Sequence, residues 1–269
     1  MRFVYPQAKR KALTFSYDDG QVYDRRLAGL FRDAGMKATF HLNSGNLGPD
    51  RDRDTFIGAE EVKEVYQGHE IACHGVWHRN PTTLTRQQLV LEIQEDRKAL
   101  EKLTGGMVQG LSYAYGSYDG EVMDVAKKLG IKYSRTVQGT GGFFPPADFL
   151  AWHPTCHHDN RLIELGEQFL HIADFYELPL MYVWGHSFEF ARSGDWSVIE
   201  AFVEKMKDRE DIWYATNIEI ADYIMATRAQ EFSADGLTMY NPTAVDVWVS
   251  AKEGILVVKP GETKEIGEL

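Results

Sequence analysis

The alternation of short apolar runs with segments of helical periodicity constrains the fold of this chain more than any other feature. Residues 12–17 read as a strand rich in β-forming side chains. Residues 22–34 then place their apolar positions on one helical face, and Gly35 stands where a helix would end. Comparable units recur along most of the chain. Strands are predicted at 12–17, 37–42, 70–73, 111–115, 131–137, 150–152, 179–184 and 212–215, and helices at 22–34, 59–67, 85–103, 120–129, 161–175, 196–207 and 217–228.

Repeated strand–helix units with short links indicate a parallel sheet, because two parallel neighbours need a crossover connection. Seven or eight such units in a chain of 269 residues favour a closed barrel over an open sheet. The pattern changes after residue 232, where 246–250 and 255–258 read as two strands joined by a turn. The sequence therefore predicts an α/β protein with a distorted (β/α) barrel over residues 1–232 and a small β-rich C-terminal appendage over residues 233–269.

Composition narrows the range of partners. Lys and Arg number 29 against 40 Asp and Glu, and the resulting net charge of −11 disfavours binding to nucleic acid. No stretch approaches the length of a membrane helix, and the N-terminus lacks the apolar core of a signal peptide. Two cysteines, Cys73 and Cys156, do not make a disulfide framework. We expect a cytoplasmic protein with neither a membrane nor a nucleic-acid partner.

Polar residues follow several predicted strands, at the end of a parallel barrel where catalytic groups collect. Asp18 and Asp19 follow the first strand, and His74 and His78 follow the third with the i, i+4 spacing that can aim two imidazoles in one direction. Each signal alone is weak, because histidine pairs are commonly surface residues and Asp-Gly after a strand is commonly a turn. Together, two imidazoles and one carboxylate form a metal-ligand set that leaves positions open for water or substrate.

Four segments resemble the motifs of one family. Residues 14–20 (TFSYDDG) resemble the first motif of the polysaccharide deacetylases, the NodB-like enzymes of carbohydrate esterase family 4, and residues 74–78 (HGVWH) resemble the second. Tyr115 and Gly116 resemble the end of the third motif, and residues 184–186 (WGH) resemble the fifth. Because the motifs keep their order over residues 10–228, the resemblance is specific. It implies a distorted NodB-type barrel and a hydrolase that removes acetyl groups from N- or O-acetylated carbohydrate.

The resemblance also implies roles for individual residues. Asp19, His74 and His78 would hold one divalent metal ion; zinc fits these ligand types, and cobalt, nickel or manganese are alternatives. Asp18 would be the general base, His186 the general acid, and the backbone N–H of Tyr115 would help to hold the oxyanion. The remaining candidates, as contacts to the substrate, are Trp77, Trp152, Trp184 and Arg135.

Two motifs depart from the family pattern. The third lacks its Arg, since Ser112 stands in that position, and the fourth has Ala151 in place of its second Asp. In the family, that Arg orients the base and that Asp orients the acid. Arg135, at a predicted strand end, and Glu189, three residues after His186, are candidate replacements.

The altered motifs keep two other functions open. One is hydrolysis of a non-sugar C–N bond, such as that of a ureide, by the same metal site. The other is carbohydrate binding without catalysis. A separate group, His157 and His158, could contact substrate or form a second metal set with Cys156, while Asp159 reads more simply as the cap of a helix.

Overall fold

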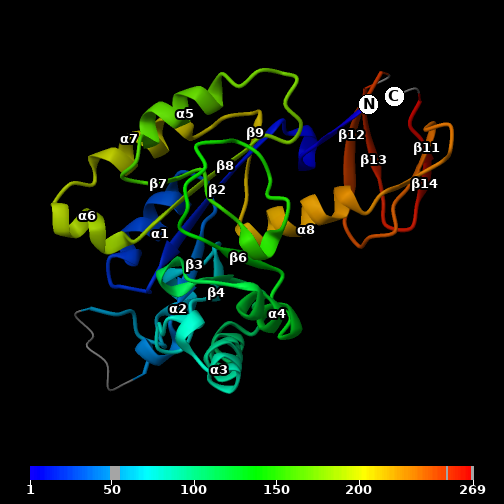
Figure 1. The fold of residues 1–269 in the computed structure, drawn as a ribbon. Coiled ribbons are helices and arrows are strands. Elements are labelled where there is room, and N and C mark those ends of the chain that lie inside the picture. Colours follow the sequence, from blue (N-terminus) through cyan, green and yellow to red (C-terminus); the bar gives the residue numbers. More distant parts are fainter. Residues whose placement is uncertain (49–54, 253, 268–269) are drawn as a thin grey trace.

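Seven parallel strands curl around a common core in the computed structural model, which describes residues 1–48, 55–252 and 254–267 (Figure 1). Their order is β6-β5-β4-β3-β2-β8-β7, and an eighth strand, β9, pairs with the first half of β2. All eight residues of the central strand β2 are buried, because the barrel interior covers one of its faces and helices cover the other. The strands are β2 (Lys11–Asp18), β3 (Thr39–Leu42), β4 (Glu70–Cys73), β5 (Gly110–Ser112), β6 (Tyr133–Arg135), β7 (Cys156–His157), β8 (Leu180–Gly185) and β9 (Ile212–Tyr214).

Beyond the edge strand β6, the chain pairs with the segment that leads into β7. Trp152 forms an isolated parallel bridge with Arg135 of β6, and it lies four residues before β7. Its backbone N donates to the carbonyl of Ser134 at 3.0 Å, and its own carbonyl accepts from the backbone N of Thr136 at 3.0 Å. The fold is therefore a distorted (β/α) barrel, as the sequence predicted.

Helices cover the outside of the barrel (Figure 1). Several begin or end at residues suited to that place: Thr85 forms a capping box with Gln88 at the start of α3, and Gly105 ends α3 in the left-handed conformation. Asp119 caps α4 by accepting from two backbone N–H groups. The helices are α1 (Asp24–Asp33), α2 (Val62–Val65), α3 (Arg86–Thr104), α4 (Gly120–Lys128), α5 (Leu162–Leu170), α6 (Ser187–Ser193), α7 (Ser197–Met206) and α8 (Asn217–Arg228).

Two local predictions were wrong. The expected strand at 150–152 is instead a 3-10 helix, Phe149–Ala151, because the carboxylate of Asp148 accepts from the backbone N of Leu150 at 2.8 Å and closes a turn. Asp159 does not cap a helix, since α5 begins at Leu162 after Arg161. The short helix α6 was not predicted; its seven residues offer too few turns for a periodic pattern.

Two small antiparallel sheets stand beside the barrel, beyond the end of α8 (Figure 1). The first contains β12 (Val247–Ala251) and β13 (Gly254–Val258), which correspond to the two predicted strands, together with β1 (Arg2–Val4) from the other end of the chain. The second contains β10 (Glu231–Phe232), β11 (Thr238–Tyr240) and β14 (Thr263–Glu265). The N-terminal strand thus belongs to the same sheet as the C-terminal segment.

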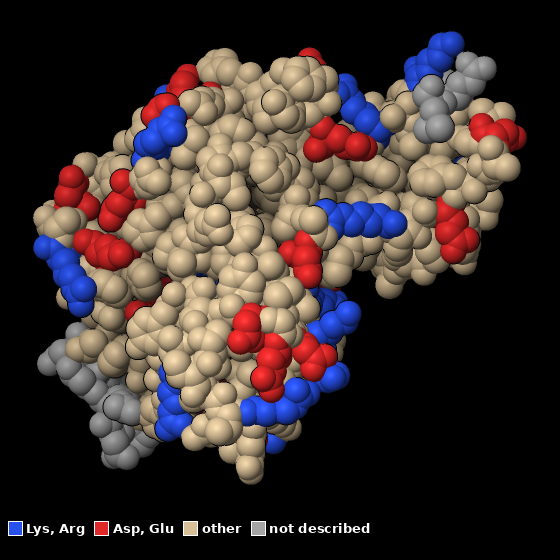
Figure 2. All heavy atoms as spheres, viewed as in Figure 1, with Lys and Arg blue, Asp and Glu red and all other residues tan. Residues whose placement is uncertain are grey.

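The surface carries both signs of charge. On the face seen in Figure 2, acidic and basic side chains alternate around the rim and leave most of the centre uncharged, so this face has no continuous basic area. Within the described part of the chain, none of the helices combines the length and apolarity that crossing a bilayer requires.

Candidate active site

The candidate residues gather at the carboxyl ends of the barrel strands. Asp18 is the last residue of β2 and Asp19 follows it, while His74 directly follows β4 and His186 directly follows β8. Parallel strands end at the same edge of a sheet, so residues that are far apart in sequence meet there. The structure brings the carboxylates of Asp18 and Asp19 each within 4 Å of the imidazole of His74.

Three possible metal-ligand atoms lie close together, one each from Asp19, His74 and His78. Oδ1 of Asp19 lies 3.6 Å from Nε2 of His74 and 3.8 Å from Nε2 of His78. Nδ1 of His74 lies 2.9 Å from the carbonyl oxygen of Ser112, to which it can donate, so Nε2 keeps its lone pair. This Nε2 is buried and has no hydrogen-bond partner within the described residues. A buried nitrogen of this kind, facing a carboxylate and a second imidazole, fits a divalent metal ion.

The backbone around this set adopts uncommon conformations. Asp19, His78 and Tyr115 have φ values of 80°, 54° and 59°, in the left-handed region that side chains other than glycine rarely occupy. The ring of Tyr115 also packs on that of His78, with 4.5 Å between ring centres. Such conformations persist where the surrounding structure holds them, and they are concentrated at functional sites.

Two acidic residues one turn apart on α3 hold the loop that carries His74. Asp96 Oδ2 accepts from the backbone N of His74 and of Gly75, both at 3.0 Å, and Glu92 Oε1 accepts from the backbone N of Trp77 at 2.7 Å. A side chain at Gly75 would place its Cβ 3.0 Å from Glu92 Oε1, in a backbone with φ 82°. The left-handed backbone and the nearby carboxylate together favour glycine at this position.

Arg135 pairs with Asp18, as the sequence suggested for the replacement of the missing Arg. Its Nη2 donates to Asp18 Oδ2, and both side chains are buried. Arg135 lies directly opposite Ser112 in the β5–β6 register, and Ser112 Oγ donates to Asp18 Oδ1 at 3.2 Å. The guanidinium thus comes from the neighbouring strand, beside a small residue that leaves it room.

The environment of Asp18 favours its charged form. Burial opposes ionisation, but the Arg135 guanidinium and the imidazoles of His74 and His41 outweigh it and hold the pKa of the Asp18 carboxyl well below its usual range. His41 was not singled out from the sequence. Its Nδ1 lies 3.5 Å from Asp18 Oδ1 and 3.1 Å from Ser16 Oγ, inside the barrel.

His186 faces Glu189, the second suggested replacement. Its Nδ1 lies 3.2 Å from Glu189 Oε2, close but not aligned as a hydrogen bond, and its backbone N donates to the same oxygen at 2.9 Å. Burial lowers the pKa of the His186 imidazole, but the carboxylates of Glu189, Asp18 and Asp19 outweigh this effect and raise it above the usual value. The protonated form is therefore favoured.

Two of the expected substrate contacts are wrong. Arg135 is 0% exposed, with its guanidinium bound to Asp18 and stacked 4.3 Å from the ring of Trp184, so it cannot reach a ligand. Trp152 is 1% exposed and packs among Tyr133, Phe149 and Tyr182 in the barrel core. The sequence cannot separate a rim aromatic from a core aromatic, since both follow strands.

The other aromatic candidates are accessible to different degrees. Trp77 is 47% exposed and Tyr115 is 68% exposed, whereas Trp184 is half-buried between Arg135 and His157. The rim near the candidate ligands therefore presents at least two large aromatic side chains to solvent.

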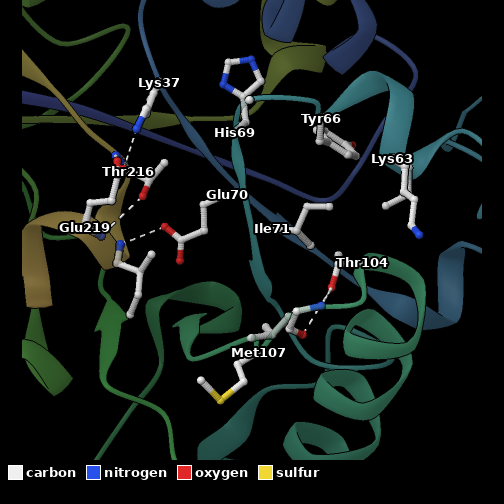
Figure 3. Close-up of a pocket in the computed structure, with 15 residues that line it drawn as sticks. Lys37, Lys63, Tyr66, His69, Glu70, Ile71, Thr104, Met107, Thr216 and Glu219 are labelled. Atoms are coloured by element: carbon white, nitrogen blue, oxygen red, sulfur yellow. Dashed lines mark hydrogen bonds and ion pairs between the residues drawn. The ribbon is translucent and has the colours of Figure 1, made fainter. Parts of the chain in front are cut away.

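A cavity of about 620 Å³ lies at the opposite end of the barrel, where the strands begin (Figure 3). The half-buried carboxylate of Glu70 accepts three hydrogen bonds, from Thr39 Oγ1 and Ile218 N at 2.9 Å and from Tyr133 OH at 2.8 Å. Lys37 at its rim pairs with Glu219. Its polar groups thus tie the start of α8 to the sheet, and the candidate catalytic groups lie at the other end.

Comparison with known proteins agrees with this geometry. Residues 5–134 match the model of the polysaccharide deacetylase family. The chain is 26% identical over 119 residues to a peptidoglycan deacetylase of Helicobacter pylori (strain ATCC 700392 / 26695), a match covering 44% of this chain and 38% of that protein. The chain thus spans well under half the length of this relative.

Two solved structures show the same fold over most of the chain. A candidate polysaccharide deacetylase from Mycobacterium smegmatis is 16% identical, with a TM-score of 0.64 over 85% of this chain and 95% of that one. The Xyl-CE4 domain of a multidomain xylanase from the hindgut metagenome of Trinervitermes trinervoides is 17% identical, with a TM-score of 0.54 over 82% of this chain and 90% of that domain. Residues 5–134, just under half of the chain, are therefore similar to the polysaccharide deacetylase family, and the barrel has the same fold as solved structures that carry that name.

Proposed function

We propose that this protein is a metal-dependent hydrolase that removes acetyl groups from N- or O-acetylated carbohydrate. The observation that carries the proposal is the convergence of Asp19, His74 and His78 beside a charged, buried Asp18. Two imidazoles and one carboxylate leave coordination positions open, as catalytic rather than structural metal sites do. The exposed rings of Trp77 and Tyr115 suit contacts with sugar faces.

The metal would be held by Asp19 Oδ1, His74 Nε2 and His78 Nε2. A divalent ion, of which zinc best fits these ligands, would polarise the carbonyl of the acetyl group and acidify water. The protein contributes the ligand geometry: Ser112 fixes the orientation of the His74 ring, and Asp96 fixes its backbone.

Asp18 is the proposed general base. Its carboxylate is ionised and held in one orientation by Arg135 and Ser112, so it can accept the proton of the attacking water. The ion pair with Arg135 lowers the basicity of the Asp18 carboxylate, but it also holds the side chain in one orientation. Orientation is the larger requirement when the attacking water, which donates the proton, is already acidified.

His186 is the proposed general acid. The Glu189 carboxylate lies 3.2 Å from Nδ1 and favours the imidazolium, which can give a proton to the departing amine or alcohol oxygen as the carbon–heteroatom bond breaks. The backbone N–H of Tyr115, set in a left-handed conformation beside His78, is the proposed donor to the carbonyl oxygen, where negative charge develops.

Release of acetate tests the proposed function directly. Protein loaded with zinc should release acetate from N-acetylated chito-oligosaccharides or acetylated xylan, with Asp18→Asn as the inactive control. Release of ammonia or a carbamoyl product from a ureide, without acetate, would instead favour hydrolysis of a non-sugar C–N bond. Glycan binding with no acetate released would favour a non-catalytic carbohydrate-binding protein.

The pH dependence should report the contact between Glu189 and His186. A general acid works while protonated, so kcat/KM should fall as pH rises through the pKa of His186, which Glu189 raises. Glu189→Gln removes the charge, and this limb should move to lower pH. Glu200→Gln, at a surface carboxylate paired with Arg26, is the matched control and should leave the limb in place. An unmoved limb in Glu189→Gln would contradict the role of this carboxylate.

A further inference from the structure

A second group of metal-ligating side chains lies beside the proposed general acid. Glu189 Oε2 lies 3.1 Å from Nε2 of His157 and 3.3 Å from Nε2 of His158, and the two rings are 4.3 Å apart between centres. With bonds of about 2.0–2.1 Å, tetrahedral zinc places neighbouring ligand atoms roughly 3.3–3.4 Å apart. The group therefore has the composition and dimensions of the first ligand set, in which the two rings are 4.6 Å apart.

His158 supplies an independent indication that an ion belongs here. It is 0% exposed, and among the described residues neither ring nitrogen has an aligned hydrogen-bond partner. Stacking on Phe190, with 4.1 Å between ring centres, holds the imidazole in place. Gly185 is required beside it, since a Cβ there would lie 2.0 Å from Nδ1. Burying an imidazole whose ring nitrogens have no hydrogen-bond partner costs free energy of folding, unless a ligand or an ion binds to it.

We infer that His157, His158 and Glu189 form a second divalent-metal site, distinct from the site of Asp19, His74 and His78. The sequence alone suggested Cys156 as the partner of these histidines. Cys156 is instead buried in the apolar core. The third ligand is Glu189 of α6, whose side chain reaches the end of β7. The ligand set of two nitrogens and one oxygen suits zinc and similar ions.

This second site binds more weakly than the first. The backbone N of Asp159 donates to Nδ1 of His157 at 3.2 Å, so the proton of the neutral ring sits on Nε2. For Nε2 to bind an ion, this proton must move to Nδ1, and the hydrogen bond from Asp159 is then lost. At the first site the arrangement is the reverse, because Nδ1 of His74 donates to a carbonyl and leaves Nε2 free. Zinc should therefore fill the two sites in sequence.

Occupation of the second site has a consequence for the proposed reaction. Glu189 Oε2 also lies 3.2 Å from Nδ1 of His186. An ion bound to this oxygen would neutralise the negative charge that favours the imidazolium form of His186. Zinc in excess of one equivalent should therefore inhibit. This consequence rests on the proposed function of His186, whereas the binding itself does not.

Titration of the metal-free protein with Zn²⁺ tests the inference without any substrate. Calorimetry and metal analysis should show two equivalents, one tight and one weaker. His157→Gln should lose the weaker equivalent alone, and His74→Ala the tighter alone. His171→Gln, at an exposed histidine beside Glu167, is the matched control and should keep both. In the activity assay, the second equivalent should inhibit the native protein but not His157→Gln.

Binding of a single equivalent that disappears in His74→Ala would overturn the second site and leave the proposed function standing. Two equivalents that both survive in His157→Gln and in Glu189→Gln would overturn it as well. If His157→Gln does not fold, as judged by circular dichroism, Glu189→Gln decides the question alone, since an amide is a far poorer zinc ligand than a carboxylate. Loss of neither equivalent in His74→Ala would instead contradict the proposed catalytic site.

Discussion

Asp18→Asn should lower kcat by roughly 10²–10⁴-fold, because an amide cannot accept the proton of the attacking water. The substitution should also destabilise the fold by about 3–5 kcal/mol, since it leaves the buried guanidinium of Arg135 without its counter-charge. The two effects arise from different properties of the same side chain. Acetate release measures the first, and urea unfolding measures the second.

A double variant separates these effects. Asp18→Asn combined with Arg135→Gln removes both charges, and much of the lost stability should return while activity does not. Arg135→Gln alone leaves the buried Asp18 carboxylate without its counter-charge. This variant should be destabilised by a similar amount to Asp18→Asn. Full turnover in Asp18→Asn, measured at saturating substrate, would rule out Asp18 as the base.

His74→Ala should remove the tightly bound ion and lower activity by roughly 10³-fold or more, because the ion's stabilisation of developing charge is worth several kcal/mol. The loss should be visible as one equivalent fewer of zinc per chain by elemental analysis. His74 is buried, so the unfolding midpoint of the variant must be measured alongside its activity. His171→Ala, at the surface, should retain both ion and activity. Normal turnover by metal-free His74→Ala would contradict the metal dependence.

Arg135 and Glu189, which contact the two proposed proton-transfer groups, come from other elements than the family motifs would supply. Arg135 reaches Asp18 from β6 because Ser112, its register partner on β5, is small. Glu189 reaches His186 from the first turn of α6, where the i, i+3 spacing turns it back toward the helix start. Both residues were named as candidates from the sequence, but their contacts depend on strand register and on a short helix that periodicity does not reveal.

The same distinction explains the errors. Trp152 ends a predicted strand, as a residue at the rim could, yet it forms a bridge with Arg135 of β6 and is buried. Asp148 closes a 3-10 turn where apolar residues suggested a strand. The pairing of Arg2 with Ser250 joins the two ends of the chain, and no local pattern records a contact between residues so distant in sequence.

The resemblance to the family motifs supplied the proposed ligand set of Asp19, His74 and His78. The local pattern by itself predicted most of the order of strands and helices, the barrel, and the end of the barrel at which polar side chains gather. These depend on periodicity, on turn-forming residues and on the rule that parallel strands end together, all of which act over short distances along the chain. The tertiary structure decided which neighbours orient Asp18 and His186, which aromatic rings are buried, and that His157 and His158 meet Glu189. Those contacts depend on register and packing between distant segments, where a shift of one residue turns a side chain from the barrel interior to the outside.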